Sequence, residues 1–134
     1  MQNILKKGEF CINCVTREMA QGVTISSAEF PYGESEMKYN DFSLAPSVKI
    51  KAPRIAESPA AMECKLVRSI DDLGDFTLII GEVLLYHVAE EIIDPSTGYI
   101  DARKSGILGR LGGADFCEIG EITTVPKKNW QEYK

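Results

Sequence analysis

The feature that most constrains this fold is a pair of adjoining segments with the pattern of antiparallel β-strands. In residues 61–70, AMECKLVRSI, apolar and polar side chains alternate as in a half-buried strand. Residues 71–75, DDLGD, predict a five-residue hairpin loop that returns into the apolar run of residues 76–89, FTLIIGEVLLYHVA. In the first strand, Met62, Cys64 and Leu66 are expected on one face and Glu63, Lys65 and Ser69 on the other.

The second strand of this hairpin is apolar on both faces. One face carries Val83, Leu85 and His87, and the other carries Leu84, Tyr86 and Val88. A two-sided apolar strand in a small β protein indicates a core on one side and a subunit interface on the other. Gly81 and Glu82 interrupt the run, so it reads as a strand and not as a membrane span.

The rest of the chain adds short elements around this hairpin. Residues 2–7 predict a helix end stopped by Gly8, and EFCINCVT at 9–16 predicts a strand. Residues 17–27 predict a short helix, and residues 28–47 a long irregular excursion of the kind that often has a function. A closing strand is expected over DFCEIGEITTV, residues 115–125. We find no repeat, so residues 1–134 are expected to form one mainly β domain, a small barrel with a few helices.

Composition excludes several classes of protein. The formal net charge is −5 and no long run of Lys or Arg occurs, which argues against a nucleic-acid partner. No stretch is long and apolar enough for a membrane span, and MQNILKKGEF lacks the apolar core of a signal peptide, so a cytoplasmic protein is expected. The cysteines of CINC, Cys11 and Cys14, lie in a predicted strand without a second such pair. We therefore expect reduced structural thiols and no metal site.

Two features are candidate sites, the glycine turn of residues 109–116 and His87. From the residues alone, each can be interpreted as structural or as functional. GRLGGADF, residues 109–116, fits neither a phosphate loop nor a dinucleotide fingerprint. It predicts a turn with Gly112 or Gly113 at positive φ, although Arg110 beside the glycines is also suited to an anion. His87 is the only histidine, and a lone histidine among apolar residues is more often structural than chemical.

Five segments, in order, together resemble the flavin reductase-like family, the FMN-binding split barrels that include flavoredoxin. The segments are NILKKGEFCINCVT (3–16), TISSAEFPYGESEM (24–37), KAPRIAESPAAMECKLV (51–67), GEVLLYHV (81–88) and GRLGGADF (109–116). The resemblance implies a Greek-key split β-barrel that binds FMN, or alternatively FAD, at a homodimer interface. It also implies hydride transfer from NADH or NADPH to the flavin, with the protein positioning both rings.

The same resemblance nominates site residues. It places His87 near the cofactors in a positioning or polarising role, and it places the 109–116 turn near the flavin and nicotinamide. Thr24 stands where many members have Asn, and Phe116 where many have Tyr. The cofactor-binding residues that it implies are Thr24, Ser26, Ser27, His87, Arg110, Gly112 and Gly113.

By this resemblance, the chain looks like the C-terminal portion of a family member, or a member truncated at an internal Met, since Met1 stands directly after the position of the family's K-D-T block. That comparison keeps three functions open. The first is an NAD(P)H-dependent flavin reductase-like oxidoreductase. The second is a flavin-binding electron-transfer module without its own pyridine-nucleotide site, and the third is a non-catalytic remnant that dimerises through its apolar strands.

Overall fold

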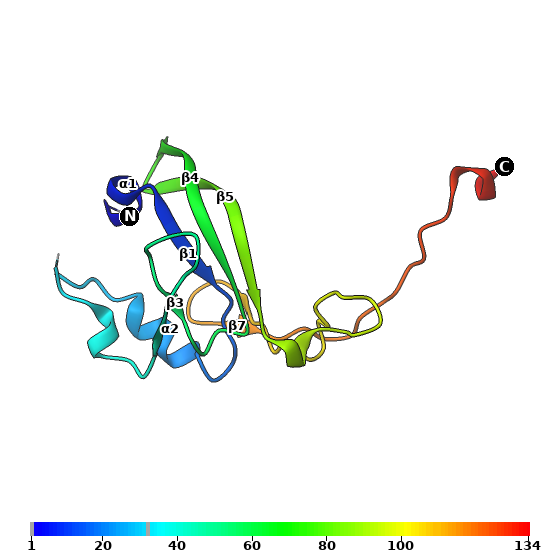
Figure 1. Cartoon of the computed structure of the whole chain (residues 1–134), viewed down its shortest axis with the longest axis horizontal. Helices are drawn as coiled ribbons and strands as arrows, with labels where there is room; N and C mark the ends of the chain where they lie inside the picture. Colours follow the sequence, from blue (N-terminus) through cyan, green and yellow to red (C-terminus); the bar gives the residue numbers. More distant parts are fainter. Residues whose placement is uncertain (1, 32) are drawn as a thin grey trace.

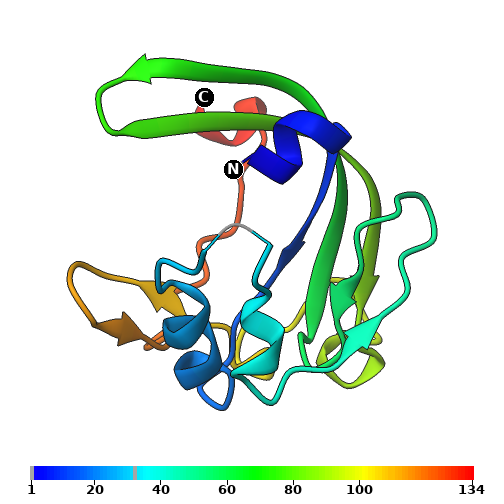
Figure 2. The same cartoon turned by 90° about the vertical axis from the view of Figure 1, so that its left-hand side faces the viewer.

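A computed structural model describes residues 2–31 and 33–134 of the chain. Its centre is an antiparallel sheet of three strands in the order β1-β4-β5, formed by β1 (Glu9–Asn13), β4 (Ala60–Leu73) and β5 (Phe76–Val88). The long β4–β5 hairpin curves over the other elements (Figures 1 and 2). The register of β4 against β5 shifts at three places, and such bulges bend a strand pair, as the wall of a barrel requires.

Short elements surround this sheet. Two further antiparallel pairs are β2–β3 and β6–β7. The bounds are α1 Gln2–Lys7, α2 Ala20–Ser26, η1 Glu36–Lys38, β2 Leu44–Ala45, β3 Arg54–Ile55, η2 Glu90–Ile92, β6 Gly109–Arg110, β7 Phe116–Cys117 and η3 Trp130–Tyr133, where η marks a 3-10 helix. The mainly β class with short helices is confirmed.

Both predicted N-terminal helices are present. Helix α1 ends at Gly8, whose φ of 70° is left-handed and whose N–H donates to the carbonyl of Ile4 at 2.8 Å. Helix α2 lies within the predicted range of residues 17–27. A Cβ atom at Gly22 would lie 2.4 Å from the Phe42 ring, so the glycine that weakens this helix lets it pack closely on the following excursion.

The predicted five-residue hairpin loop at 71–75 is wrong. Strand β4 continues to Leu73 and β5 starts at Phe76, which leaves Gly74 and Asp75 as a two-residue turn. Gly74 adopts a φ of 72°, the conformation that tight hairpin turns require. The acidic residues Asp71 and Asp72 extend strand β4 instead of forming the loop.

The predicted closing strand at 115–125 is largely wrong as well. Only Phe116–Cys117 forms a strand, paired with β6. Among the described residues, no strand pairs with residues 118–129, and a strand needs a partner for its backbone groups. This segment leaves the body as an extended arm that ends in η3 (Figure 1).

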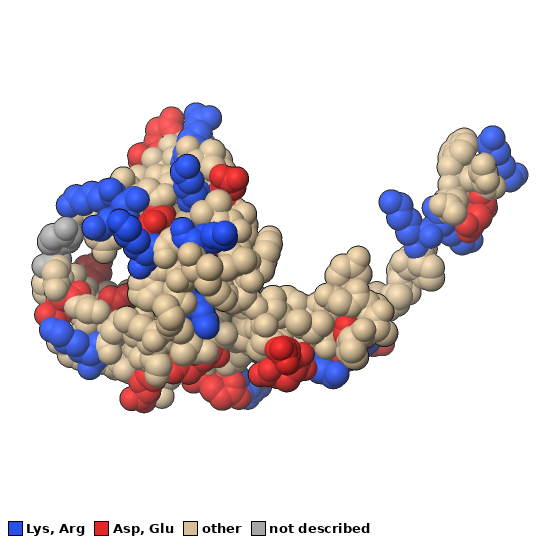
Figure 3. Space-filling view, in the orientation of Figure 1, with Lys and Arg blue, Asp and Glu red and all other residues tan. Residues whose placement is uncertain are grey.

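The chain covers only part of its apolar surface. Among the described residues, few apolar ones are buried, namely Met19, Ile50, Ala60, Ala61, Cys64 and Ile92. Strand β5 stays open along much of its length, with Phe76 79% exposed and Tyr86 65% exposed. In Figure 3, charged side chains of both signs are spread over the face shown. No helix among the described residues combines the length and apolar character that a membrane crossing needs.

Candidate functional site

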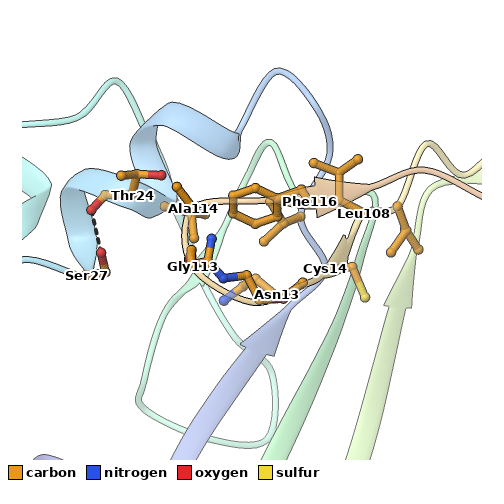
Figure 4. A pocket seen from close by; sticks show the side chains of 12 residues that line it. Asn13, Cys14, Thr24, Ser27, Leu108, Gly113, Ala114 and Phe116 are labelled. Carbon is orange, nitrogen blue, oxygen red and sulfur yellow. Dashed lines mark hydrogen bonds between the residues drawn. The ribbon is translucent and has the colours of Figure 1, made fainter.

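A cavity of about 550 Å³ lies between the end of β1, helix α2 and the β6–β7 hairpin (Figure 4). Apolar side chains form much of its wall, among them Val23, Leu108 and Phe116. Four polar side chains also line it, namely Asn13, Thr24, Ser27 and Arg110. A mostly apolar cavity with a few polar groups is the usual form of a cofactor site.

The β6–β7 hairpin supplies one wall through a glycine turn. Gly113 has a φ of 65°, so the predicted positive-φ turn is confirmed at that glycine. The turn is closed by the N–H of Leu111, which donates to the carbonyl of Asp115 at 3.0 Å. The Arg110 guanidinium donates to the carbonyl of Gly113 and lies 4.6 Å from the centre of the Phe116 ring. The cation of Arg110 is thus fixed by its own hairpin at the edge of the cavity.

Helix α2 supplies the opposite wall with two hydroxyl groups. The Thr24 hydroxyl donates to the carbonyl of Ala20 at 3.0 Å, and the Ser27 hydroxyl donates to the carbonyl of Thr24 at 2.6 Å. Both hydroxyl protons are therefore engaged within the helix. The lone pairs of both oxygens remain available as acceptors for an N–H or O–H group of a ligand.

The structure brings together four of the nominated residues and separates three. Thr24, Ser27, Arg110 and Gly113 line this one cavity. Ser26 lines a different hollow beside residues 28–31 and 33–36, and its hydroxyl oxygen accepts from the side-chain amide of Asn40 at 3.1 Å. Gly112 shapes the turn without lining the cavity, and His87 lies in a second polar centre.

This second centre is built on Glu63, which sequence reasoning placed on the polar face of its strand. That prediction is wrong, because the Glu63 side chain is completely buried. Its carboxylate accepts hydrogen bonds from the backbone N–H groups of Val48 (2.7 Å), Lys49 (2.6 Å) and Ile50 (3.2 Å). The segment of residues 44–55, which carries β2 and β3, therefore covers this face of the sheet, and the strand pattern alone does not reveal this.

His87 is the fourth donor to this carboxylate. Its Nε2 lies 2.5 Å from Oε1 of Glu63, and because a carboxylate only accepts, Nε2 carries the proton. Burial by itself raises the pKa of the Glu63 carboxyl, but the hydrogen bonds from His87 and the three backbone N–H groups lower it to about 2. Glu63 is therefore a carboxylate at neutral pH.

His87 also lines a hollow of about 400 Å³ together with Arg54, Ser58 and Tyr86. A hydrogen bond links the walls of the two hollows. The Ser58 hydroxyl lies 2.8 Å from the carbonyl oxygen of Cys14, a residue that lines the first cavity. Sequence reasoning missed Glu63 and Arg54. The sequence did contain one signal for Glu63. This acidic residue lies between apolar residues on one strand of the predicted hairpin, and the only histidine lies on the other strand.

The cysteines fit structural roles better than redox chemistry. All four are free thiols, and burial raises the pKa of Cys11, Cys14 and Cys64. A raised pKa disfavours the thiolate, which is the reactive form. No group of three or more His, Cys, Asp or Glu side chains suited to a metal ion occurs within residues 2–31 and 33–134.

Known proteins share this architecture. A solved structure described as having a split barrel domain, from Shewanella frigidimarina, matches with a TM-score of 0.84 at 22% identity and covers 95% of this chain and 64% of that chain. The fold is therefore that of the split barrels, as expected. The sequence model of the flavin reductase like domain matches residues 1–107. The chain belongs to the flavin reductase-like family, a family of flavin-related oxidoreductases.

Two relatives show how similar this chain is to other proteins in sequence and in length. The 2-nitrobenzoate 2-nitroreductase NbaA of Pseudomonas fluorescens is 29% identical with a TM-score of 0.83, covering 96% of this chain and 64% of that chain. An uncharacterized protein of Deinococcus radiodurans is 31% identical over an alignment of 138 positions, which covers 97% of this chain and 59% of the relative. The chain thus spans less than two thirds of the length of these relatives.

Proposed function

We propose that this chain binds FMN in the cavity between α2 and the β6–β7 hairpin and acts as a flavin reductase-like oxidoreductase that takes hydride from NADH or NADPH. The observation that carries the proposal is that four residues nominated by family resemblance, from two distant segments, line one cavity: Thr24, Ser27, Arg110 and Gly113. FAD is the alternative flavin.

The side chains around the cavity fit such a cofactor. Val23, Leu108 and Phe116 offer apolar contact to a planar ring, and the hydroxyl oxygens of Thr24 and Ser27 offer acceptors to its polar edge. The guanidinium of Arg110 offers a cation to an anionic group. A bound flavin would supply the redox chemistry, while these residues hold and orient it and exclude water from its surroundings. The positioning role that the family resemblance implies for His87 stays a prediction, because His87 does not line this cavity.

We further propose that the chain forms a homodimer through β5. The support is the exposed apolar surface of this strand, where Val83 and Leu84 are each 37% exposed and Tyr86 is 65% exposed. The molar mass in solution, measured by light scattering, tests this proposal. Replacing Tyr86 by Lys should yield monomers, whereas replacing Tyr99, which is 77% exposed, by Lys should leave the dimer intact.

An FMN titration followed by visible absorbance tests the main proposal. The chain should bind FMN saturably at micromolar concentration and then oxidise NADH or NADPH. Replacing Ala114, which lines the cavity, by Trp should block FMN binding and leave the fold intact, and replacing the exposed Ala102 by Trp is the matched control. Binding of FMN without NADH or NADPH oxidation would instead favour an electron-transfer module. Absence of FMN binding would favour the hypothesis that the chain is a non-catalytic protein that dimerises through its apolar strands.

A further inference from the structure

We propose that the hollow between the β2–β3 pair and the end of β5 is a second ligand site, which binds an anionic group, a carboxylate or a phosphate, through Arg54 and His87. The site goes beyond the proposed flavin cavity, since none of the residues that line one hollow lines the other. Three observations carry the proposal: an unpartnered buried donor, a histidine with one ring nitrogen left over, and a lining without acidic side chains.

The unpartnered donor is the Nε–H group of Arg54. This atom is buried and has no hydrogen-bond partner in the described part of the chain. None of the ion pairs among the described residues involves the Arg54 guanidinium either. Folded proteins satisfy nearly all their buried donors, and a charged donor left without an acceptor is especially unfavourable. The missing acceptor is therefore expected to come from a ligand.

The histidine is fixed so that one ring atom is left for that ligand. Nε2 of His87 donates to the buried carboxylate of Glu63, which sets the orientation of the ring. No described residue contacts Nδ1 by a hydrogen bond, and the His87 side chain is 22% exposed. With its proton on Nε2, the ring leaves Nδ1 as an acceptor, to which an O–H or P–OH group of the bound ligand can donate.

The remaining walls admit an anion. No Asp or Glu is among the residues that line the hollow. The nearby Glu57 carboxylate accepts from the backbone N–H of Ser43 with both oxygens, at 2.9 and 3.1 Å. The carboxylate of Glu63 is engaged by its four donors. The hollow of about 400 Å³ has room for a phosphate or a small dicarboxylate.

Calorimetric titration of the chain with inorganic phosphate and with succinate, in a buffer free of both, tests this site. Saturable binding is expected, and Arg54→Gln should weaken it at least about tenfold. Arg54→Lys should retain part of the affinity because it keeps the cation. Arg68→Gln, which changes an exposed arginine on β4, is the matched control and should bind as the unaltered chain does.

The two probes separate the sources of the anion. Tighter binding of phosphate assigns the site to a phosphate-bearing ligand, and tighter binding of succinate assigns it to a carboxylic acid. Absence of saturable binding of either probe, or equal binding by Arg54→Gln with its fold intact, would overturn the proposal. Displacement of phosphate by FMN would also overturn it, since the two hollows would then hold one ligand. The Ala114→Trp variant, whose flavin cavity is blocked, should still bind phosphate, because Ala114 does not line this hollow. A failure of the proposed flavin site can therefore be distinguished from a failure of this anion site.

Discussion

The two polar centres of this protein are built in opposite ways. The Glu63 carboxylate is fully buried, and its donors come from residues 13 to 24 positions away in sequence. The Arg110 guanidinium is exposed, and its hydrogen bond and ring contact lie within its own hairpin, at Gly113 and Phe116. One centre joins distant parts of the fold, while the other is a local structure at the edge of a cavity.

Because of this difference, we expect changes at Glu63 to affect the stability of the fold and changes at Arg110 to affect ligand binding. Loss of the Glu63 carboxylate would leave several buried donors without an acceptor, so it should affect the whole fold. Loss of the Arg110 side chain would remove an exposed cation from a hairpin that keeps its backbone hydrogen bonds, so it should affect mainly the ligand. Variants at the two centres therefore test whether Glu63 contributes mainly to stability and Arg110 mainly to ligand binding.

The largest effect is expected for Glu63→Ala. The variant removes the acceptor of three backbone N–H groups in residues 48–50 and of His87, and the segment of residues 44–55 that covers the sheet loses these hydrogen bonds. We expect the midpoint of thermal unfolding to fall by more than about 10 °C. Glu57→Ala is the control, because that exposed carboxylate accepts from only one backbone N–H group, that of Ser43. Equal midpoints for the two variants would contradict a structural role of Glu63.

The second effect is a loss of stability in acid. The pKa of the Glu63 carboxyl is about 2 in the folded chain and about 4.5 when unperturbed, so the unfolded chain binds the proton more readily. Its stabilising contribution is therefore complete above about pH 4.5 and disappears as the pH falls toward 2.

Urea unfolding midpoints between pH 2 and pH 7 measure this loss. Because other carboxylates titrate in the same range, the comparison is with Glu63→Gln, which cannot ionise at this position. The difference in midpoint between the two proteins should shrink as the pH falls from 4.5 to 2. A constant difference across this range would show that the Glu63 charge does not contribute.

The features that the sequence predicted are mostly local. The ends of α1 and α2 and the glycine turn of residues 109–116 depend on nearby residues, and a resemblance in five segments indicated the family. The hairpin was predicted but its loop was not, since Asp71 and Asp72 are more typical of loops than of strands.

The features that it missed depend on contacts between distant segments. Alternation in residues 61–70 placed Glu63 in solvent, and only the packing of residues 48–50 over β4 reverses this. The pairing of His87 with Glu63 depends on the register of β4 against β5, in which Ala61 is opposite His87. The unpartnered Nε of Arg54 is likewise a property of the folded chain and has no counterpart in a residue pattern.

At the other centre, Arg110→Ala should weaken FMN binding about tenfold and leave the unfolding midpoint nearly unchanged. The reason is that Arg110 lines the proposed flavin cavity, whereas the one hydrogen bond of its guanidinium within the described part of the chain is to a carbonyl in an exposed turn. Fluorescence quenching of FMN measures the affinity. Arg68→Ala, on the exposed side of β4, should bind FMN normally, and equal affinities of the two variants would remove Arg110 from the site.

The smallest effect separates the two neighbouring glycines of the hairpin. Gly113 has a φ of 65° and Gly112 does not have a positive φ, while a Cβ atom at either position meets nothing within 4 Å. Gly113→Ala should therefore cost about 1 kcal/mol through backbone strain alone, and Gly112→Ala should be close to neutral. Because the strained turn carries the carbonyl that holds Arg110, the Gly113 variant should also bind FMN somewhat more weakly. Urea unfolding and FMN titration of both variants measure this. Equal effects at both glycines would mean that the shape of the turn does not fix the Arg110 cation.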